Sequence, residues 1–220
     1  MGEMSEVTRF KVGYDESFIY VAGELFTSDP STITTNSLTR DKYSSDDVFA
    51  IVIDGFNDNQ NATWFFTNPD GVRFDVALSN DADFGGGRNA FNDSWNAFWD
   101  VETTITDEGW FAEMRIPFSS IGVQEINNTT EMGIIVYRWI TKKNERHIYP
   151  AIPPNWNLGN AKPSQAQDVI LEGVKSKNPL YITPYGLGGI NSISTLNSDS
   201  TQYTYDNDFT TEVGFDLKYK

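Results

Sequence analysis

The sequence predicts an all-β protein, an antiparallel β-sandwich followed by the first strands of a second β unit. Helical periodicity is nearly absent, and short alternating runs of apolar and polar residues recur between turn residues. Aromatic residues make up 14% of the chain, which is far too much apolar surface for a disordered segment. The 220 residues are enough for one sizeable core, with room for a second domain.

The first half of the chain contains five expected strands. They cover residues 7–14, 18–26, 48–54, 62–68 and 72–78. The run 48–54 is apolar without interruption, which is typical of a strand that is covered on both faces. Pro69-Asp70-Gly71 is a strong hairpin turn between the last two strands. The polar stretch 28–47 is expected to be a loop.

The second half continues the same pattern. Its expected strands cover residues 98–105, 110–116, 132–140, 146–149 and the segment around 169–171. The run 132–140 is apolar on both faces and is therefore expected to be central in its sheet. Residues 79–96 and the Pro-rich residues 150–163 are expected to be long loops. Many short strands joined by polar turns indicate a sandwich or a barrel.

The character of the chain changes after residue 174. Residues 211–219 alternate apolar and polar side chains next to a Tyr- and Gly-rich stretch at 181–189. Outer-membrane strands alternate over ~10 residues in this way, but a solvent-facing edge strand alternates as well. We expect a sandwich at 1–174 and the start of a C-terminal β-barrel-type domain at 175–220. Because Lys220 lies inside the last strand, we expect the chain to be a piece of a longer protein.

Charge and composition exclude some classes of function. The formal net charge is −15, and an acidic surface repels phosphate backbones, so nucleic-acid binding is not expected. The charge suits an extracytoplasmic protein, a neutral ligand such as a sugar, or cation binding by carboxylates. The chain has no cysteine, which excludes a disulfide framework. No stretch approaches the ~18 apolar residues of a membrane helix.

Three segments resemble the family 9 carbohydrate-binding modules. In residues 45–54 an Asp precedes an apolar run that ends in Asp, as in the central strand of that family. Residues 109–118 resemble its strand with the pattern G-x-x-x-E-x-x-I-P-x, and Asn155-Trp156-Asn157 stands at the place of its late tryptophan loop. The resemblance implies a β-sandwich that binds sugar. Ser164-Gln165-Ala166-Gln167 departs from the customary Ser-Arg-Phe-Gly of the family.

Two further segments resemble a group of bacterial outer-membrane proteins. These proteins join such a module to a C-terminal β-barrel domain of unknown function. One segment is residues 66–72, and the other combines Tyr137-Arg138 with residues 144–146 and Tyr149-Pro150. The resemblance implies an outer-membrane location, with the module on the periplasmic or the extracellular face.

The candidate sugar-binding residues are aromatic platforms with neighbouring polar groups. Sugar recognition needs aromatic faces for the C–H surface of the ring and fixed polar groups for the hydroxyls. Trp156 and Asn155, in a polar loop, are the first candidates, and a loop anchor is the structural alternative for Trp156. Trp95 and Trp99 either line the same cleft or enter the core. Asp54, by the resemblance, and Arg138 are the polar candidates, although Arg138 suits a structural ion pair with Glu113 equally well.

The acidic loops are candidates for a structural calcium ion, which the resemblance implies. Asp47, Asp81 and Asp83 are the candidate ligands. Asp81-Ala82-Asp83 begins like a calcium loop, but Gly85 stands at the third ligand position and Asn92 at the twelfth. An EF-hand site is therefore not expected, and a solvated acidic loop is the alternative. No other cofactor is expected.

Catalytic signals are weak. His147 is the only histidine, and the chain has no G-x-S-x-G elbow. A hydrolase is the least favoured class, although glycosidase chemistry needs only two carboxylates. We therefore expect a non-catalytic carbohydrate-binding module of a larger bacterial outer-membrane protein, held at the membrane through a C-terminal barrel. The alternatives are a structural or interaction domain without a sugar ligand, or a domain associated with a glycoside hydrolase.

Overall fold

A computed structural model describes residues 3–83, 90–175 and 180–219. The chain forms two compact units, Met1–Lys177 and Asn178–Lys220. The first unit ends at Lys177, whereas the sequence pattern placed the boundary at residue 174. Among the described residues, the first unit forms two sheets and the second unit forms one.

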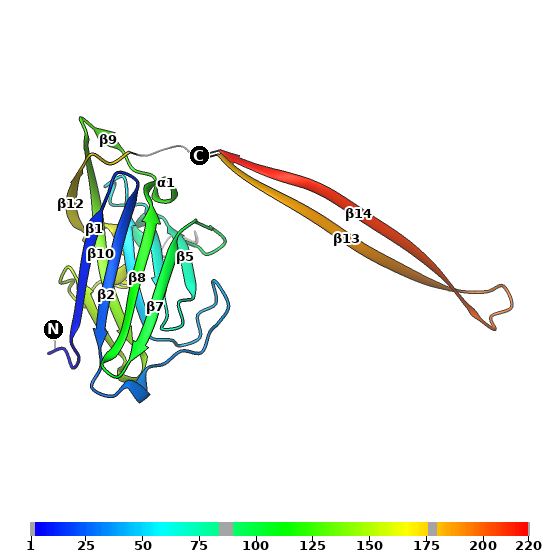
Figure 1. Cartoon of the computed structure of the whole chain (residues 1–220), viewed down its shortest axis with the longest axis horizontal. Helices are drawn as coiled ribbons and strands as arrows, with labels where there is room; N and C mark the ends of the chain where they lie inside the picture. Colours follow the sequence, from blue (N-terminus) through cyan, green and yellow to red (C-terminus); the bar gives the residue numbers. More distant parts are fainter. Residues whose placement is uncertain (1–2, 84–89, 176–179, 220) are drawn as a thin grey trace. The chain divides into compact units, whose positions relative to one another are not determined.

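The first unit contains a four-stranded antiparallel sheet, here called sheet A (Figure 1). Its strands are, in spatial order, β1 (Thr8–Tyr14), β2 (Phe18–Phe26), β8 (Gly109–Pro117) and β7 (Asp100–Thr106). The turn between β1 and β2 is held by Asp15, whose Oδ1 accepts hydrogen bonds from the backbone N–H groups of Ser17 at 2.7 Å and Phe18 at 2.8 Å. Gly109 begins β8 with a φ of 143°, a conformation that favours glycine.

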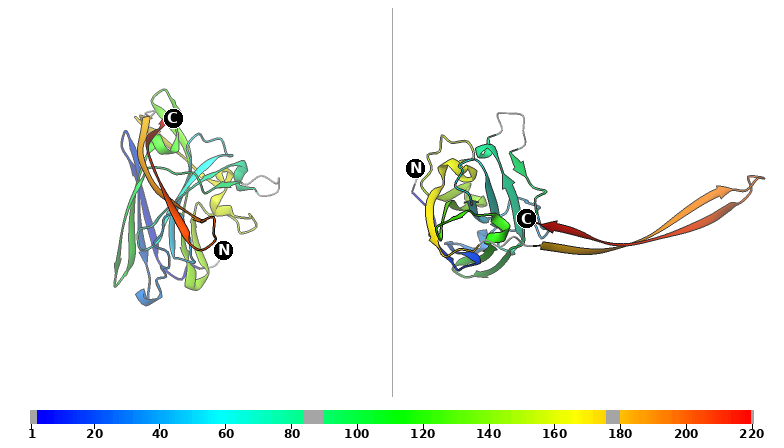
Figure 2. Two further views of the ribbon diagram at one scale, coloured as in Figure 1. Left: turned by 90° about the vertical axis from the view of Figure 1, so that its right-hand side faces the viewer. Right: turned by 90° about the horizontal axis from the view of Figure 1, so that it is seen from above.

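An eight-stranded sheet, here called sheet B, faces sheet A as a second layer (Figure 2). Its main path runs β11 (Glu145–Tyr149), β10 (Thr129–Ile140), β3 (Val48–Asp54), β4 (Ala62–Thr67), β5 (Arg73–Leu78) and β6 (Phe91–Asn92). The strands β9 (Glu125–Ile126) and β12 (Gln167–Glu172) also pair with β10. This arrangement confirms the predicted all-β sandwich and the central position of β10.

Short helical turns connect the strands. They are η1 (Pro30–Thr32), η2 (Asn80–Ala82), α1 (Phe118–Ile121), η3 (Thr141–Lys143), η4 (Gly159–Ala161) and η5 (Pro163–Gln165). Within the described part of the chain, no helix is long and apolar enough to cross a membrane.

The main core lies between the two sheets. Strands β2 and β8 alternate, so that Val21 and Met114 point inward while Tyr20 and Arg115 point outward. From sheet B, Ile51 and Phe65 meet this layer, and both are fully buried. In β2 and β8, every second residue therefore enters the core.

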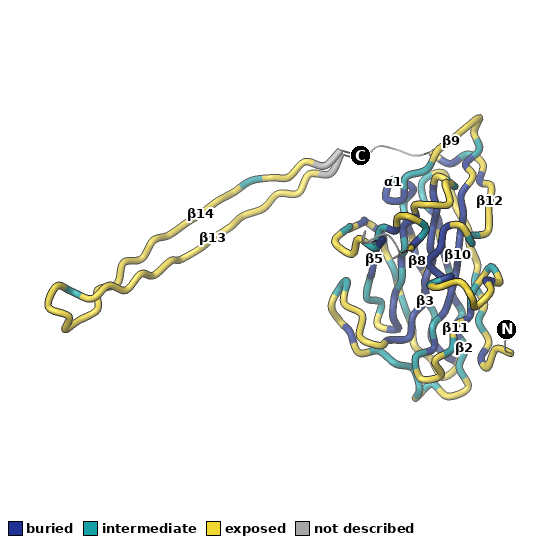
Figure 3. Tube along the Cα trace, turned by 180° about the vertical axis from the view of Figure 1, so that it is seen from behind, coloured by how far each residue is buried: buried dark blue, intermediate teal, exposed yellow. Residues whose placement is uncertain are grey.

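Every residue of β3 is buried, as its uninterrupted apolar sequence predicts (Figure 3). The loop between β11 and β12 supplies the second cover. Ile152 and Ala161 of this loop pack with Val52 and Ile135 on the outer face of sheet B. Aromatic side chains continue the outer layer, and Phe66 stacks on Phe74 with ring centres 4.5 Å apart. Sheet B is thus covered on both faces, which sheet A is not.

The second unit is one antiparallel hairpin of β13 (Leu180–Leu196) and β14 (Tyr203–Tyr219). Because directly opposed residues share a face, the register sorts the side chains into two rows. One row is apolar and contains Ile182, Pro184, Ile190, Phe209, Val213, Phe215 and Leu217. The other is largely polar, with Thr183 opposite Asp216 and Asn191 opposite Asp208. The described side chains of both rows are almost all exposed (Figure 3).

Candidate functional site

The loop that carries Trp156 is a sequence of tight turns. The Trp156 N–H donates to the carbonyl of Pro153 at 3.2 Å, and the Gly159 N–H donates to the carbonyl of Trp156 at 3.3 Å. A Cβ at position 159 would lie 2.8 Å from Cγ2 of Ile152, so only glycine allows this approach. Trp156 remains 42% exposed, and the neighbouring Asn155 is exposed as well.

A buried lysine and an aspartate anchor this loop to η2. Nζ of Lys162 donates to the carbonyl of Asp81 at 2.7 Å, and Lys162 is only 8% exposed. The Asp81 carboxylate accepts hydrogen bonds from the N–H of Ser164 at 2.9 Å and from its hydroxyl at 2.8 Å. Nζ of Lys162 also lies 5.9 Å from the centre of the Trp156 ring, within the range of a cation–π contact. The exposed indole is therefore presented by a fixed loop.

Asp54 closes its own turn rather than facing a ligand. It is 1% exposed, and its carboxylate accepts the backbone N–H groups of Asp58 at 3.2 Å and Asn59 at 2.8 Å. Burial raises the pKa of Asp54 despite these hydrogen bonds. The prediction that Asp54 contacts sugar is therefore corrected, because both carboxylate oxygens serve the backbone of the turn.

Arg138 points into the sandwich and not toward the Trp156 loop. It is 1% exposed and its Nη1 donates to the carbonyls of Phe26 at 2.7 Å and Val7 at 3.2 Å. Arg138 lies opposite Phe49 of β3, whose side chain belongs to the main core. Glu113, the expected ion-pair partner, is exposed on the outer face of sheet A. Both predictions for Arg138 are corrected, because the side chain joins the start of β1 to sheet B.

Trp99 is a core residue. It is 2% exposed, its indole N–H donates to Oδ1 of Asp75 at 3.1 Å, and its ring packs edge-on against Phe65 at 5.4 Å. Trp95 is half-buried and packs edge-on against the same Phe65 at 6.0 Å. Phe65 belongs to the inner face of sheet B, whereas the Trp156 loop covers the outer face. The prediction of Trp99 as a sugar platform is therefore wrong, and Trp95 does not share a cleft with Trp156.

The candidate calcium ligands do not form one site. Strands β3 and β5 run in the same direction, because each is antiparallel to β4. Asp47 precedes β3 and Asp81 follows β5, so they lie at opposite ends of the sheet, roughly 20 Å apart by strand length. Asp47 is buried and accepts the Thr141 N–H at 2.8 Å.

Asp81 is taken by Lys162 and Ser164, and Gly85 of the expected loop lies outside the described residues. Within residues 3–83, 90–175 and 180–219, no three His, Asp or Glu side chains converge as metal ligands. The residues Asp47, Asp81 and Asp83 therefore do not fit a shared calcium site.

A groove of about 890 Å³ crosses the outer face of sheet A. Tyr20 and the ion pair of Arg115 with Asp100 form one part of its lining. Glu102 and Glu113 are directly opposed on neighbouring strands and also line it. Like charges in opposed positions destabilise a sheet, so this pair lowers the stability of sheet A locally.

No protein-family model matches the sequence, and a search of curated proteins finds no match. Solved structures do match. A family 9 carbohydrate-binding module from Caldicellulosiruptor kristjanssonii, in complex with glucose, has a TM-score of 0.52 at 17% identity and covers 80% of this chain and 82% of its own. The same kind of module with cellotriose has a TM-score of 0.51 at 19% identity and covers 81% and 84%.

A candidate carbohydrate-binding protein from Bacteroides uniformis has a TM-score of 0.56 at 11% identity and covers 74% of this chain and 77% of its own. The chain has the fold of a family 9 carbohydrate-binding module. On this module fold, Trp156 is the predicted site residue that combines a large exposed aromatic face with a fixed loop.

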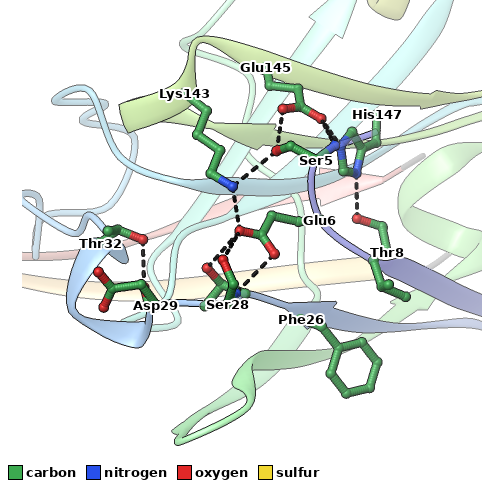
Figure 4. Close-up of polar contacts among 12 residues, drawn as sticks. Ser5, Glu6, Thr8, Phe26, Ser28, Asp29, Thr32, Lys143, Glu145 and His147 are labelled. Carbon is green, nitrogen blue, oxygen red and sulfur yellow. Dashed lines mark hydrogen bonds and ion pairs between the residues drawn. The ribbon is translucent and has the colours of Figure 1, made fainter. Parts of the chain in front are cut away.

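The module fold also contains a polar network that no local motif predicted (Figure 4). Thr8 Oγ1 lies 2.6 Å from Nδ1 of His147, and Nε2 of His147 lies 2.6 Å from Glu145. Glu145 also accepts the Ser5 N–H at 2.8 Å and the Ser5 hydroxyl at 2.6 Å. Burial alone would raise the pKa of Glu145, but these donors outweigh it and hold the pKa at about 2. Thr8 and His147 are 139 positions apart in sequence, so only the pairing of the sheets brings them together.

Proposed function

We propose that the chain is a non-catalytic carbohydrate-binding module that stacks a sugar ring on Trp156. The observation that carries the proposal is Trp156, which is 42% exposed on the loop that Lys162 and Asp81 anchor. Because the loop is held in place, the exposed ring loses little conformational entropy when a sugar binds to it. The likeness in fold to modules solved with glucose and cellotriose supports the same function.

The surroundings of Trp156 suit a neutral ligand. Asn155 is exposed beside the indole and carries an amide that both donates and accepts hydrogen bonds. The net charge of −15 disfavours acidic glycans and places no penalty on neutral ones. The proposed ligand is therefore a neutral mono- or oligosaccharide.

Calorimetric titration with glucose and cellotriose, extended by a glycan array, tests this proposal. We expect the Trp156→Ala variant to bind at least about tenfold more weakly, since a lost stacking platform costs ~1.4 kcal/mol or more. Phe98→Ala is the matched control, because Phe98 is an exposed aromatic residue, 63% exposed, that precedes β7. Equal affinities of Trp156→Ala and the parent chain, or no binding of any sugar by the parent, would contradict it.

A structural or interaction domain is the second candidate function. It is favoured by Asp54, Trp99 and Arg138, since the side chain of each forms hydrogen bonds within the fold and does not face a ligand. The same titration separates the two functions, because an interaction domain binds no sugar while its fold stays intact.

A glycoside hydrolase is a third candidate, and the opposed Glu102 and Glu113 are the observation that favours it. Retaining glycosidases place two carboxyl groups ~5 Å apart, which is close to the spacing of opposed strand residues. Incubation with cellotriose and assay of new reducing ends tests this. We expect no release above that of a Glu113→Gln control.

For location, we propose that the second unit inserts into a bacterial outer membrane. The segregation of its two faces supports this. The apolar row from Ile182 to Ile190 spans roughly 27 Å. At a strand tilt of ~40° this is about 21 Å, which covers most of the ~25 Å apolar band of outer-membrane proteins.

Flotation of the full chain with phosphatidylcholine vesicles tests this location. Phe209→Asp and Phe215→Asp change the apolar row, and Leu187→Asp on the opposite row is their control. We expect the first two to reduce the floated fraction severalfold and the control to leave it unchanged. The same loss for all three variants would count against a lipid-facing row.

A further inference from the structure

The groove on the outer face of sheet A runs across the strands, over a floor with a small side chain at its middle. One row of the sheet register crosses β1, β2, β8 and β7 and contains Lys11, Ala22, Glu113 and Glu102 (Figure 1). Because neighbouring strands lie ~4.8 Å apart, this row is about 14 Å long. Ala22 contributes only a methyl group, so the face is lowest there. The groove volume of about 890 Å³ is in the upper part of the ~300–1,000 Å³ range of ligand sites.

Aromatic side chains stand on both sides of this floor. Tyr20 precedes Ala22 by two residues on the same face of β2, and Phe111 lies opposite Glu24, which follows Ala22 by two residues. A second hollow, of about 270 Å³, lies on the side of Phe111 and shares Ala22 with the groove as a lining residue. A ligand that follows the row therefore passes between Tyr20 and Phe111.

The ring of Tyr20 is held in place while it remains accessible. Its hydroxyl donates to Oδ2 of Asp15 at 2.8 Å, and its ring lies 6.1 Å from that of Phe18. Tyr20 is nevertheless 38% exposed and lines the groove. An aromatic face that is already fixed loses little conformational entropy on binding, and it suits the C–H surface of a sugar ring.

The ion pair of Arg115 with Asp100 keeps one donor and one acceptor available to a ligand. Both hydrogen bonds of the pair, from Nε at 3.2 Å and from Nη2, end at Oδ2 of Asp100. Within the described part of the chain, Nη1 of Arg115 and Oδ1 of Asp100 form no hydrogen bond, and the two side chains are 53% and 62% exposed. A hydroxyl group both donates and accepts, so a hydroxyl-bearing ligand can use both atoms without breaking the pair.

Glu102 and Glu113 add further acceptors at the β7 end of the row. They are directly opposed and exposed, and neither forms a hydrogen bond or an ion pair with another residue that the structure describes. Hydroxyl hydrogens donated by a ligand would form charge-assisted hydrogen bonds with both carboxylates and reduce their mutual repulsion.

The charge of the groove argues for a neutral ligand. Its charged lining residues are Lys11, Arg73, Arg115, Asp100, Glu102 and Glu113. Three positive and three negative charges cancel, and Glu24, 3.5 Å from Lys11, leaves a surplus of only one negative charge. Such a lining has little electrostatic preference for an anion or a polycation, and an apolar ligand would remove its charges from water at a cost.

The backbone of this face is not available to a peptide. Strands β2 and β8 are paired on both sides, so their N–H and C=O groups are used within sheet A. Recognition on the face therefore depends on side chains that accept and donate hydrogen bonds, which suits a neutral ligand rich in hydroxyl groups.

We propose that this groove is a second carbohydrate-binding surface, which takes an extended neutral oligosaccharide across the four strands of sheet A. One sugar ring packs on Tyr20, and hydroxyl groups of the chain bind Asp100, Arg115 and the two opposed glutamates. The proposal rests on the proposed function for the class of ligand, but it uses another face, because the Trp156 loop covers the outer face of sheet B. The length of the row and the volume of the groove favour several sugar rings over one.

The test is a calorimetric titration of the Trp156→Ala chain, in which the proposed site on sheet B is removed. The ligands are cellohexaose, xylohexaose, mannohexaose and laminarihexaose, with glucose as the short ligand. We expect at least one hexaose to bind this chain at least about tenfold more tightly than glucose does, since its contacts extend across the sheet.

Variants of the floor and of the wall locate the effect. Ala22→Phe, added to Trp156→Ala, fills the groove at a strand position that suits an aromatic residue, and it should weaken hexaose binding at least about tenfold. Ile170→Phe is the matched control, because Ile170 is 63% exposed on β12, outside the groove, and it should leave binding unchanged. Tyr20→Ala should weaken binding severalfold, whereas Tyr20→Phe keeps the ring and should not. If Ala22→Phe does not fold, the two Tyr20 variants still decide.

The proposal is overturned if no hexaose binds the Trp156→Ala chain, if Ala22→Phe leaves the affinity unchanged, or if Ile170→Phe weakens it equally. Displacement of the hexaose by an equal concentration of spermidine would also overturn it, in favour of a cationic ligand. Loss of all sugar binding in Trp156→Ala contradicts the groove and supports the Trp156 site. Unchanged glucose binding in Trp156→Ala, with hexaose binding that Ala22→Phe removes, gives the reverse result.

Discussion

The sandwich and the hairpin use the same strand alternation but reach opposite degrees of burial. In β3 all seven residues are buried, because sheet A covers one face and the loop with Ile152 covers the other. In β13 and β14 nearly every described side chain is exposed, including Phe209 at 69% and Val213 at 89%. The comparison shows that a strand pattern specifies a face and not what covers it. The free energy of packing comes only with the second layer.

The largest contrast is expected from aromatic truncation. Trp110 of β8 is fully buried, and Trp110→Ala should lower the free energy of unfolding of the first unit by about 3–5 kcal/mol. Phe209→Ala in the hairpin leaves no cavity and should change it by less than ~0.5 kcal/mol. Urea unfolding followed by tryptophan fluorescence measures both. Similar losses for the two variants would show that the hairpin contributes to the stability of the sandwich.

The glycines give a second contrast. A Cβ at Gly109 would lie 2.3 Å from the carbonyl oxygen of Leu25, and the φ there is +143°. Gly109→Ala should therefore cost about 2–3 kcal/mol. Gly188→Ala in β13, where nothing lies within 4 Å, should cost nothing measurable in water. Thermal unfolding of the two variants is the comparison, and a tolerated Gly109→Ala would show that β2 and β8 can separate locally.

Lowering the pH should destabilise the sandwich through protonation of Glu145. Its folded pKa of about 2 lies below the ordinary 4.5, so its carboxylate stabilises the fold above about pH 4.5 and this contribution is lost between pH 4.5 and 2. Because the side chain is 23% exposed, we expect a loss on the order of 2 kcal/mol rather than the full value of the shift. Unfolding measured at several pH values should show this slope in the parent chain and a flatter one in Glu145→Gln. Equal slopes in the two proteins would show that Glu145 does not cause the pH dependence of stability.

The smallest effect is expected within the hairpin. Tyr185 lies opposite Gly214, and a Cβ at 214 would be 2.5 Å from its ring, so the ring covers the glycine backbone. Tyr185→Ala should weaken this cross-strand contact by about 0.2–1 kcal/mol. Faster amide hydrogen exchange around residue 214, with unchanged exchange in β3, would report it. Faster exchange in both places would mean that the two units are coupled.

Sequence patterns were sufficient for most of the fold. The apolar run of β3, the turn at Pro69-Asp70-Gly71 and the alternation of β14 depend on neighbours within a few positions, so local chemistry predicts them. The sequence also predicts that Trp156 is exposed, because a tryptophan between two asparagines and after two prolines belongs to no apolar strand face.

The rest of the candidate site could not be predicted in this way. Trp99 and Trp156 are both candidate stacking platforms by sequence, yet Trp99 meets Phe65 and Asp75 across the core while Trp156 remains outside. Asp54 looked like a ligand residue until the backbone of its own turn took both carboxylate oxygens. Which of these outcomes holds depends on where the chain folds back, and no local pattern contains that information.

The sequence by itself determined the strands, their turns and the face that each alternating strand presents, since these follow from side-chain period and backbone preference over a few residues. Only the tertiary structure decided what lies against each face. It set Arg138 against oxygens of β1 and β2, brought Thr8 to His147 across 139 positions, and formed the groove across the outer face of sheet A. The physical reason is that burial and charge pairing depend on contacts between distant strands, which form only when the two sheets close on one another.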